Sequence, residues 1–157
     1  MRIEELLVEE PYRDSAELRL NVRLILAQVA LQKDEHARAM EHLNHAEAVY
    51  LAGGVPESEV VVRLFSLKGR IHRDLWEMEE AGAALETALE IGHRSQQSPH
   101  RNLFQGHHRY ARMLMNLGRL DAAREQFHAA ITQSGQLQDT ELYSAHSILS
   151  IMEGMLG

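Results

Sequence analysis

Apolar side chains recur along the chain at the spacing of an α-helix. The first such series is Leu20, Leu24, Ala27 and Leu31. Residues three, four and seven apart share one face of a helix, so this series predicts an amphipathic helix over residues 14–32. Asp14 and Glu17 stand three apart at its start, in the pattern of a capping box. A second helix is predicted over 34–52 and ends at Gly53-Gly54.

The same arrangement of small and large side chains returns every 42 residues. Two sets of alanines keep this spacing, Ala39, Ala81 and Ala123 in one and Ala46, Ala88 and Ala130 in the other. Between the sets stand Leu43, Leu85 and Phe127, and twelve residues before the first set stand Ala27, Gly69 and Ala111. A small side chain lets neighbouring helices approach closely, and a larger one fills the remaining gap. The chain therefore contains an internal repeat, and each repeat unit is a pair of helices.

Three repeat units are predicted within a single domain that comprises residues 1–157. Their ranges are 14–54, 56–96 and 98–137, and the second and third units turn at Leu75-Trp76 and Leu117-Gly118. A last helix over 139–156 stands alone and is expected to cap the array. At the other end, Ile3, Leu6 and Leu7 are expected to cover the first unit. No unit buries its apolar face by itself, so the units are expected to stack into an all-α superhelix.

The third unit resembles the tetratricopeptide repeat (TPR). The matching residues are Tyr110, Ala111, Leu117, Gly118, Ala123, Phe127 and Ala130. The resemblance extends over residues 14–137 and implies a right-handed superhelix of helix-turn-helix units. The 34-residue consensus is stretched here by eight residues, which looks like the units of kinesin light chains and of maltose-type transcription regulators of bacteria. Lys68, Glu47 and Glu153 depart from the consensus.

Composition and charge narrow the class of protein. The chain has 157 residues, no cysteine, and 23 acidic against 16 basic side chains, which gives a net charge of −7. This charge disfavours direct binding to nucleic acid or to an anionic membrane, and no apolar stretch is long enough to span a membrane. The absence of cysteine fits a cytoplasmic location. No zinc-protease, nucleophile-elbow or phosphate-loop motif is present, so neither an enzyme nor a cofactor is expected.

The resemblance implies that the first helix of each unit lines a concave surface on which partners bind. The residues expected there are Asn21, Gln28, Arg63, Ser66, Arg70, Arg73, Gln105, His108, Arg109, Arg112 and Asn116. Arginine binds carboxylates and phosphates through paired hydrogen bonds, so the expected partner is a protein or peptide, and an acidic one fits best. The alternative is that these arginines only keep the helices soluble by pairing with nearby acids. The carboxylate clamp of chaperone-binding TPR proteins is matched only at Arg109.

Ten histidines raise the question of a metal site. His42 and His45 are three apart on one predicted helix, and four others, His93, His100, His107 and His108, lie around the second linker. No carboxylate stands at ligand spacing beside these four, so the histidines are expected to be exposed and no metal is expected. His72 is expected to fill the core. Trp76 occupies a tight turn, and it either packs over that turn or is exposed as an anchor for a partner.

The last predicted helix is apolar over much of its surface, whereas a helix that caps an array has a polar outer face. Its residues Ile148, Ile151, Met152 and Met155 are expected to face a second copy of the chain and to form a homodimer. The alternative is that a further unit of a longer chain covers them.

Three functions are compatible with these patterns, of which the third and weakest is an assembly role in which self-association through the last helix is the whole function. The first is a non-enzymatic scaffold that binds a partner protein or peptide along a locally basic concave groove. The second is a sensory or regulatory module of a bacterial signalling or transcription regulator, in which the superhelix binds a signal and controls an output domain. An output domain does not fit within 157 residues, so the second function requires a longer parent chain or a separate protein.

Overall fold

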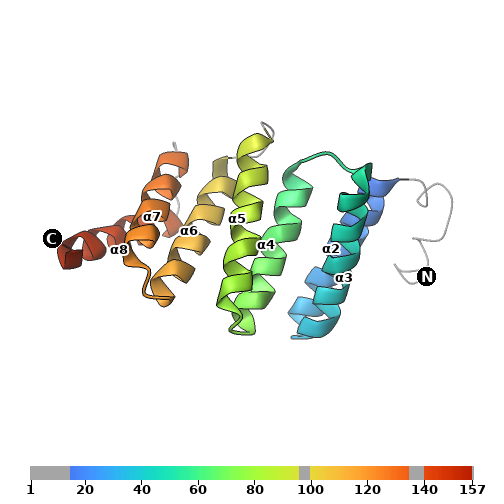
Figure 1. Ribbon diagram of the computed structural model, residues 1–157, viewed down its shortest axis with the longest axis horizontal. Helices are drawn as coiled ribbons and strands as arrows, with labels where there is room; N and C mark the ends of the chain where they lie inside the picture. The colour runs from blue at the N-terminus through green and yellow to red at the C-terminus, as the bar shows by residue number, and fades with distance from the viewer. Residues whose placement is uncertain (1–14, 96–99, 135–139, 157) are drawn as a thin grey trace.

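The computed structural model describes residues 15–95, 100–134 and 140–156, and these residues form helices and the turns between them. The elements are α2 (Ala16–Gln32), α3 (His36–Val49), the π-helical turn η1 (Tyr50–Gly54), α4 (Glu59–Asp74), α5 (Met78–Arg94), α6 (His100–Asn116), α7 (Leu120–Ser134) and α8 (Thr140–Leu156). Figure 1 shows three antiparallel pairs side by side along the long axis, with α8 beside α7. The predicted all-α helical repeat is confirmed. Some predictions concern residues outside the described ranges. These are the unit and helix boundaries placed at 14, 96, 98, 137 and 139, and the cover of the first unit by Ile3, Leu6 and Leu7.

The first helix begins one residue later than the capping-box pattern predicts. Ser15 is the N-cap of α2, and its side-chain oxygen accepts a hydrogen bond from the backbone N–H of Leu18 at 3.2 Å. A serine at this place satisfies one of the four N–H groups that the first helical turn leaves unpaired. The assignment of the cap to Asp14 is therefore wrong, because Ser15 already fulfils that role.

The turn inside each helix pair has the same backbone geometry in all three units. Asp34, Trp76 and Gly118, which are 42 residues apart, have φ values of 58°, 65° and 72°. The N–H of the residue that follows each of them donates to the carbonyl five residues earlier, from Glu35 to Ala30 and from Arg119 to Leu114 in the outer units. This is the Schellman end of a helix, which normally has glycine in the left-handed position. Trp76 adopts it with its side chain 83% exposed, so it does not pack over the turn.

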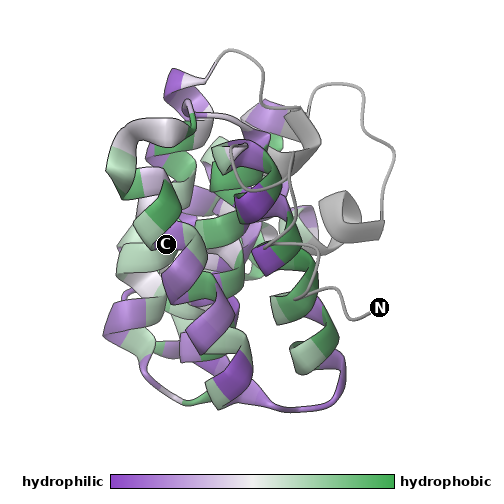
Figure 2. Cartoon of the chain, turned by 90° about the vertical axis from the view of Figure 1, so that its right-hand side faces the viewer, coloured by the Kyte–Doolittle hydropathy of each residue, from purple (hydrophilic) through white to green (hydrophobic). Residues whose placement is uncertain are grey.

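The small residues of the repeat lie where helices touch. Ala39, Ala81 and Ala123 are fully buried. A Cβ atom added at Gly69 would lie 2.8 Å from Leu85 Cγ and 3.2 Å from the backbone oxygen of Ala81. Glycine at this position therefore permits the close approach of α4 and α5. Figure 2 shows hydrophobic and hydrophilic segments alternating along the helices, as this packing requires.

The buried apolar residues form two clusters that meet in α5. The first cluster joins α2, α3 and α4 with Ala88 and Ile91 from the second half of α5. The second joins α6, α7 and α8 with Ala81 and Leu85 from its first half. Since each unit contacts only its neighbours in such arrays, α5 is the element through which the two ends of the protein stabilise each other.

Two departures from the repeat consensus turn out to be partners. Lys68 on α4 donates to Glu47 on α3 through a contact of 2.5 Å between Nζ and Oε2. The two side chains are only 15% and 27% exposed. They join the first unit to the second across the α3–α4 contact. Either residue without the other would leave a half-buried charge with no counter-charge, which destabilises the fold.

We expect Lys68→Met to destabilise the fold by about 1–3 kcal/mol, because it leaves the Glu47 carboxylate half-buried without its donor. The double variant Lys68→Met/Glu47→Met is expected to lose less than the sum of the two single variants. Urea unfolding of all four proteins measures the coupling between the two positions. Strictly additive losses would show that the pair contributes nothing specific.

The last helix packs on α7 through one apolar stripe. Ala145, Leu149 and Met152 lie in the second cluster, and Met152 is only 4% exposed. The prediction that Met152 faces a second copy is wrong, because its position three residues after Leu149 places it on the packed face of α8. Ile151 is 60% exposed and Ile148 is half-buried, whereas the side chain of Met155 lies outside the described residues. Over the described helices, none is long and apolar enough to cross a membrane.

Candidate partner-binding surface

Three hollows lie on the surface formed by the first helices of the units, α2, α4 and α6. The largest, of about 290 Å³, is lined by Gln28 of α2, by a row on α4 that includes Arg63, Ser66 and Arg70, and by Gln105 and Arg109 of α6. A second, of about 200 Å³, extends along α4 to Arg73. A third, of about 250 Å³, extends over α2 to Gln32. Arg70 lines all three, so we call the joined hollows the arginine groove.

The arginine groove contains most of the residues that the repeat predicts for partner binding. Gln28, Arg63, Ser66, Arg70, Arg73, Gln105 and Arg109 all line it. The described residues that line it include four arginines and one acid, Glu59. The arginine side chains are exposed, while Ser66 and Gln105 are half-buried between them. The groove is therefore basic on a protein whose net charge is negative.

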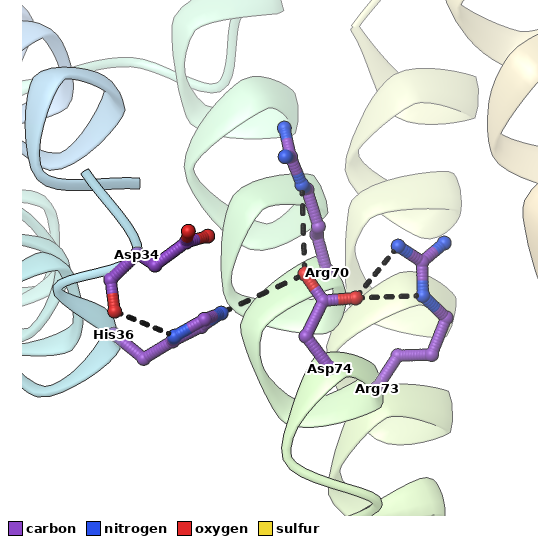
Figure 3. A network of polar contacts seen from close by, with 5 residues as sticks. All are labelled: Asp34, His36, Arg70, Arg73 and Asp74. Carbon is purple, nitrogen blue, oxygen red and sulfur yellow. Dashed lines mark hydrogen bonds and ion pairs between the residues drawn. The ribbon is translucent and has the colours of Figure 1, made fainter. Parts of the chain in front are cut away.

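One end of the groove holds an ion-pair network centred on Asp74, the last residue of α4 (Figure 3). The Nε and Nη2 atoms of Arg73 donate to Asp74 Oδ1 at 3.2 and 2.8 Å. The Nε atom of Arg70 lies 3.7 Å from Asp74 Oδ2. His36 adds its Nε2 atom at 3.9 Å from the same oxygen, an ion pair only when the imidazole is protonated. Asp74 thus holds two groove arginines by their guanidinium groups.

His36 itself is fixed by the turn of the first unit. Its Nδ1 atom lies 3.0 Å from the backbone oxygen of Asp34, to which it donates. The residues expected from the sequence to bind a partner did not include Asp74. An acid four residues after an arginine on a helix is a signal of such a pair.

Four of the residues predicted for binding lie elsewhere. Asn21 donates from its side-chain amide to the backbone oxygen of Glu17 at 3.0 Å, within its own helix. Arg112 and Asn116 are exposed on α6 but line none of the three hollows. His108 is wrongly placed on the open face, since it is 6% exposed and stacks on Phe104 at a centroid distance of 5.8 Å. The ring of Phe127 also contacts it, at a centroid distance of 5.7 Å, so His108 is part of the core.

Other histidines are also buried where exposure was expected. His42 is 5% exposed, and its Nδ1 atom accepts from Arg23 Nη1 at 3.2 Å. His107 is buried between α5 and α7. The prediction that His72 fills the core is also wrong. This side chain is half-buried, and its Nδ1 atom lies 2.6 Å from Glu77 Oε2. Within the described part of the chain, no group of three or more His, Asp or Glu side chains gathers to hold a metal.

Burial lowers the pKa of His107 below its ordinary value of 6.5. The hydrogen bond to Gln126 raises this pKa, and the neighbouring His93 lowers it further. His107 Nδ1 lies 2.8 Å from Gln126 Oε1, so Nδ1 carries the proton, and Nε2 accepts from His93 Nε2 at 3.0 Å. The neutral imidazole is therefore the form that the folded protein favours at neutral pH.

We expect the free energy of unfolding to fall when the pH drops below 6.5. The unfolded chain binds a proton at His107 more readily than the folded one, so stability rises with pH across this range. The slope from one group is at most about 1.4 kcal/mol per pH unit and levels off below the lowered pKa. Urea denaturation of the wild type and of His107→Gln at pH 7.5 and 5.0 measures this loss of stability. An equal loss in both proteins would assign the effect to other groups.

The arrangement has a counterpart among known structures. No protein-family model matches the chain, and no curated protein matches it. The solved structure of BtubC (BKLC) from P. vanneervenii, a kinesin light chain-like protein of the TPR type, is similar to it with a TM-score of 0.75 and 16% sequence identity. The match covers 96% of this chain and 59% of that one, so this chain spans about three fifths of the length of its neighbour. The TPR-like helical repeat fold is thereby shown.

Proposed function

We propose that the protein is a non-enzymatic scaffold that binds an acidic segment of another protein in the arginine groove. The observation that supports this most directly is the meeting of three hollows at Arg70, with four arginines and a single acid among the described lining residues. Guanidinium groups bind carboxylates through charge-assisted hydrogen bonds. A TPR-like fold is a type of scaffold, which agrees with a role without catalysis.

The shape of the groove favours an extended segment over a compact small molecule. Each hollow is at or below the lower limit of about 300–1,000 Å³ that is typical of small-molecule sites. The hollows continue into one another across three helices, as a site for an extended chain does. We therefore place the sensory or regulatory module, which would bind a small signal, second. In either function the units would be stretched TPR units of the kinesin light chain or maltose-regulator kind.

Binding of charge-matched peptides tests this proposal. The purified chain is titrated into labelled peptides of equal length that carry glutamate, glutamine or lysine at the same positions, and fluorescence anisotropy is recorded. We expect binding of the glutamate series alone, with an affinity that falls as salt is added. Equal affinity for the glutamine and glutamate series would contradict an acidic ligand.

Asp74 competes with such a ligand for Arg70 and Arg73. Asp74→Asn keeps the size of the side chain but removes its charge, so we expect it to raise the affinity for the glutamate peptides about three- to tenfold. Asp121→Asn is the matched control, because Asp121 pairs with Arg124 at 3.5 Å on α7, outside the groove. A gain of the same size in both variants would reflect net charge and not the loss of a competing carboxylate.

A further inference from the structure

The second hollow of the arginine groove has the most strongly basic lining. Arg70 and Arg73 of α4, Arg109 of α6 and Ser66 surround a volume of about 200 Å³. Among the described residues that line this hollow there is no acid, whereas the first hollow includes Glu59. We propose that the second hollow is a subsite for a phosphorylated serine or threonine side chain of the bound segment, an inference that rests on the binding function proposed above.

The donors that α4 contributes lie on one side of that helix. Ser66 and Arg70 are four residues apart, and Arg73 follows three residues later, so the three side chains share a face. Ser66 is half-buried and both arginines are exposed, so the hydroxyl lies deeper in the hollow than the guanidinium groups. The remaining lining residues, Gly69 and Leu85, are buried and bring no acceptor side chain that would compete for these donors.

Asp74 orients the two arginines of α4 in different ways. Arg73 directs its Nε and Nη2 atoms at Asp74 Oδ1, so one side of its guanidinium group is engaged. Arg70 approaches Asp74 Oδ2 only with its Nε atom, at 3.7 Å, and both of its terminal nitrogens point away from that carboxylate (Figure 3). Asp74 therefore fixes the direction of Arg70 without covering the end of its guanidinium group, which is the part that binds an anion.

A phosphate group uses these donors more fully than a carboxylate does. A carboxylate has one negative charge and two oxygens in one plane, so a single arginine fork engages most of it. A phosphorylated side chain has about 1.5–2 negative charges at pH 7 and three terminal oxygens that point in different directions. It therefore accepts hydrogen bonds from Arg70, from Arg109 on α6 and from the Ser66 hydroxyl at the same time.

Peptides that differ only at their centre test the subsite. The full chain is titrated into labelled peptides of one glutamate-bearing sequence, with serine, glutamate, two adjacent glutamates or phosphoserine at the centre. We expect phosphoserine to raise the affinity at least about tenfold over glutamate, and also above the two glutamates, which bring the same charge. If the glutamate peptides bind and phosphoserine adds nothing over two glutamates, the subsite is wrong and the proposed function stands. If none of the peptides binds, the proposed function fails and the subsite with it.

The ratio of the phosphoserine affinity to the glutamate affinity locates the gain in the protein. Arg109→Lys keeps the charge but loses the fork of donors, and Ser66→Ala removes the hydroxyl, so each is expected to lower this ratio about threefold or more. The matched controls are Arg63→Lys, since Arg63 lines the first hollow but not the second, and Ser150→Ala, which replaces an exposed serine of α8. Both controls should keep the wild-type ratio. An equal fall in controls and test variants, or no fall in either test variant, overturns the proposal.

Discussion

Replacing both Arg70 and Arg109 by glutamate is expected to abolish binding of acidic peptides while the helical fold remains. Arg70 lines all three hollows and Arg109 lines two of them, so the double variant changes every part of the groove. Each change removes a donor for carboxylates and adds a like charge, and two such changes are worth about 3 kcal/mol or more. That corresponds to a loss of at least about a hundredfold in affinity. Anisotropy titration measures the affinity, and circular dichroism measures the helix content.

The control for this variant makes the same two Arg→Glu changes on α3 and α7, outside the groove. Arg38 and Arg124 pair with Glu35 and Asp121 on α3 and α7, and neither lines the groove. Arg38→Glu/Arg124→Glu alters net charge equally and is expected to keep most of the affinity. Arg112→Glu should also keep it, because Arg112 lies outside the hollows although the repeat aligns it with Arg70. Equal losses in the two double variants, and half that loss in free energy for Arg112→Glu, would mean that net charge, and not the groove, attracts the peptide.

Phe127→Ala is expected to lower the free energy of unfolding by about 3–5 kcal/mol. Phe127 is fully buried in the second cluster and contacts the ring of His108 edge to face at 5.7 Å. Truncation removes this contact and leaves a cavity between α6 and α7 that the small alanines around it do not fill. Phe127→Leu places in the third unit the residue that the first two units have, and it is expected to cost only about 1–1.5 kcal/mol. Urea unfolding monitored by circular dichroism gives both values.

Ile151→Ala serves as the reference for this loss. Ile151 is 60% exposed on α8, so its truncation creates no cavity and is expected to change stability by less than about 0.5 kcal/mol. A value for Phe127→Ala within 1 kcal/mol of the Ile151→Ala value would contradict the packing described for the second cluster.

The fold was predictable because close helix contacts require small side chains at fixed positions. The repeat of the structure therefore appears in the amino-acid sequence as alanines 42 residues apart. These are Ala39, Ala81 and Ala123, and all three are fully buried. The backbone geometry of the turns was harder to predict from the sequence. The three turn residues Asp34, Trp76 and Gly118 all have a positive φ, but only a glycine indicates it in advance. The start of α2 was misjudged by one residue, because Asp14 and Ser15 are both good caps and only the observed bond distinguishes them.

The candidate site was predictable to the extent that it lies along single helices. Seven of the eleven residues expected from their place in the repeat line the arginine groove. His108 was misplaced because the period of a helix does not determine its rotation about its own axis, which here turns His108 inward and Arg109 outward. Contacts between helices need the assembled fold. Lys68 and Glu47 are 21 positions apart, and His93 and His107 are 14 apart, so no local pattern joins either pair.

Trp76, the exposed turn residue of the second unit, provides an intrinsic fluorescence signal for binding in the groove. Trp76 is the only tryptophan of the chain, and its indole lies in water in the folded state as it does in the unfolded one. Its fluorescence emission therefore responds little to unfolding. It lies three residues after Arg73 and two after Asp74. A bound segment that runs past Arg73 over the turn would therefore shield the indole and shift its emission to shorter wavelengths. Intrinsic fluorescence thus reports occupancy of this end of the groove without a label, and separately from loss of the fold.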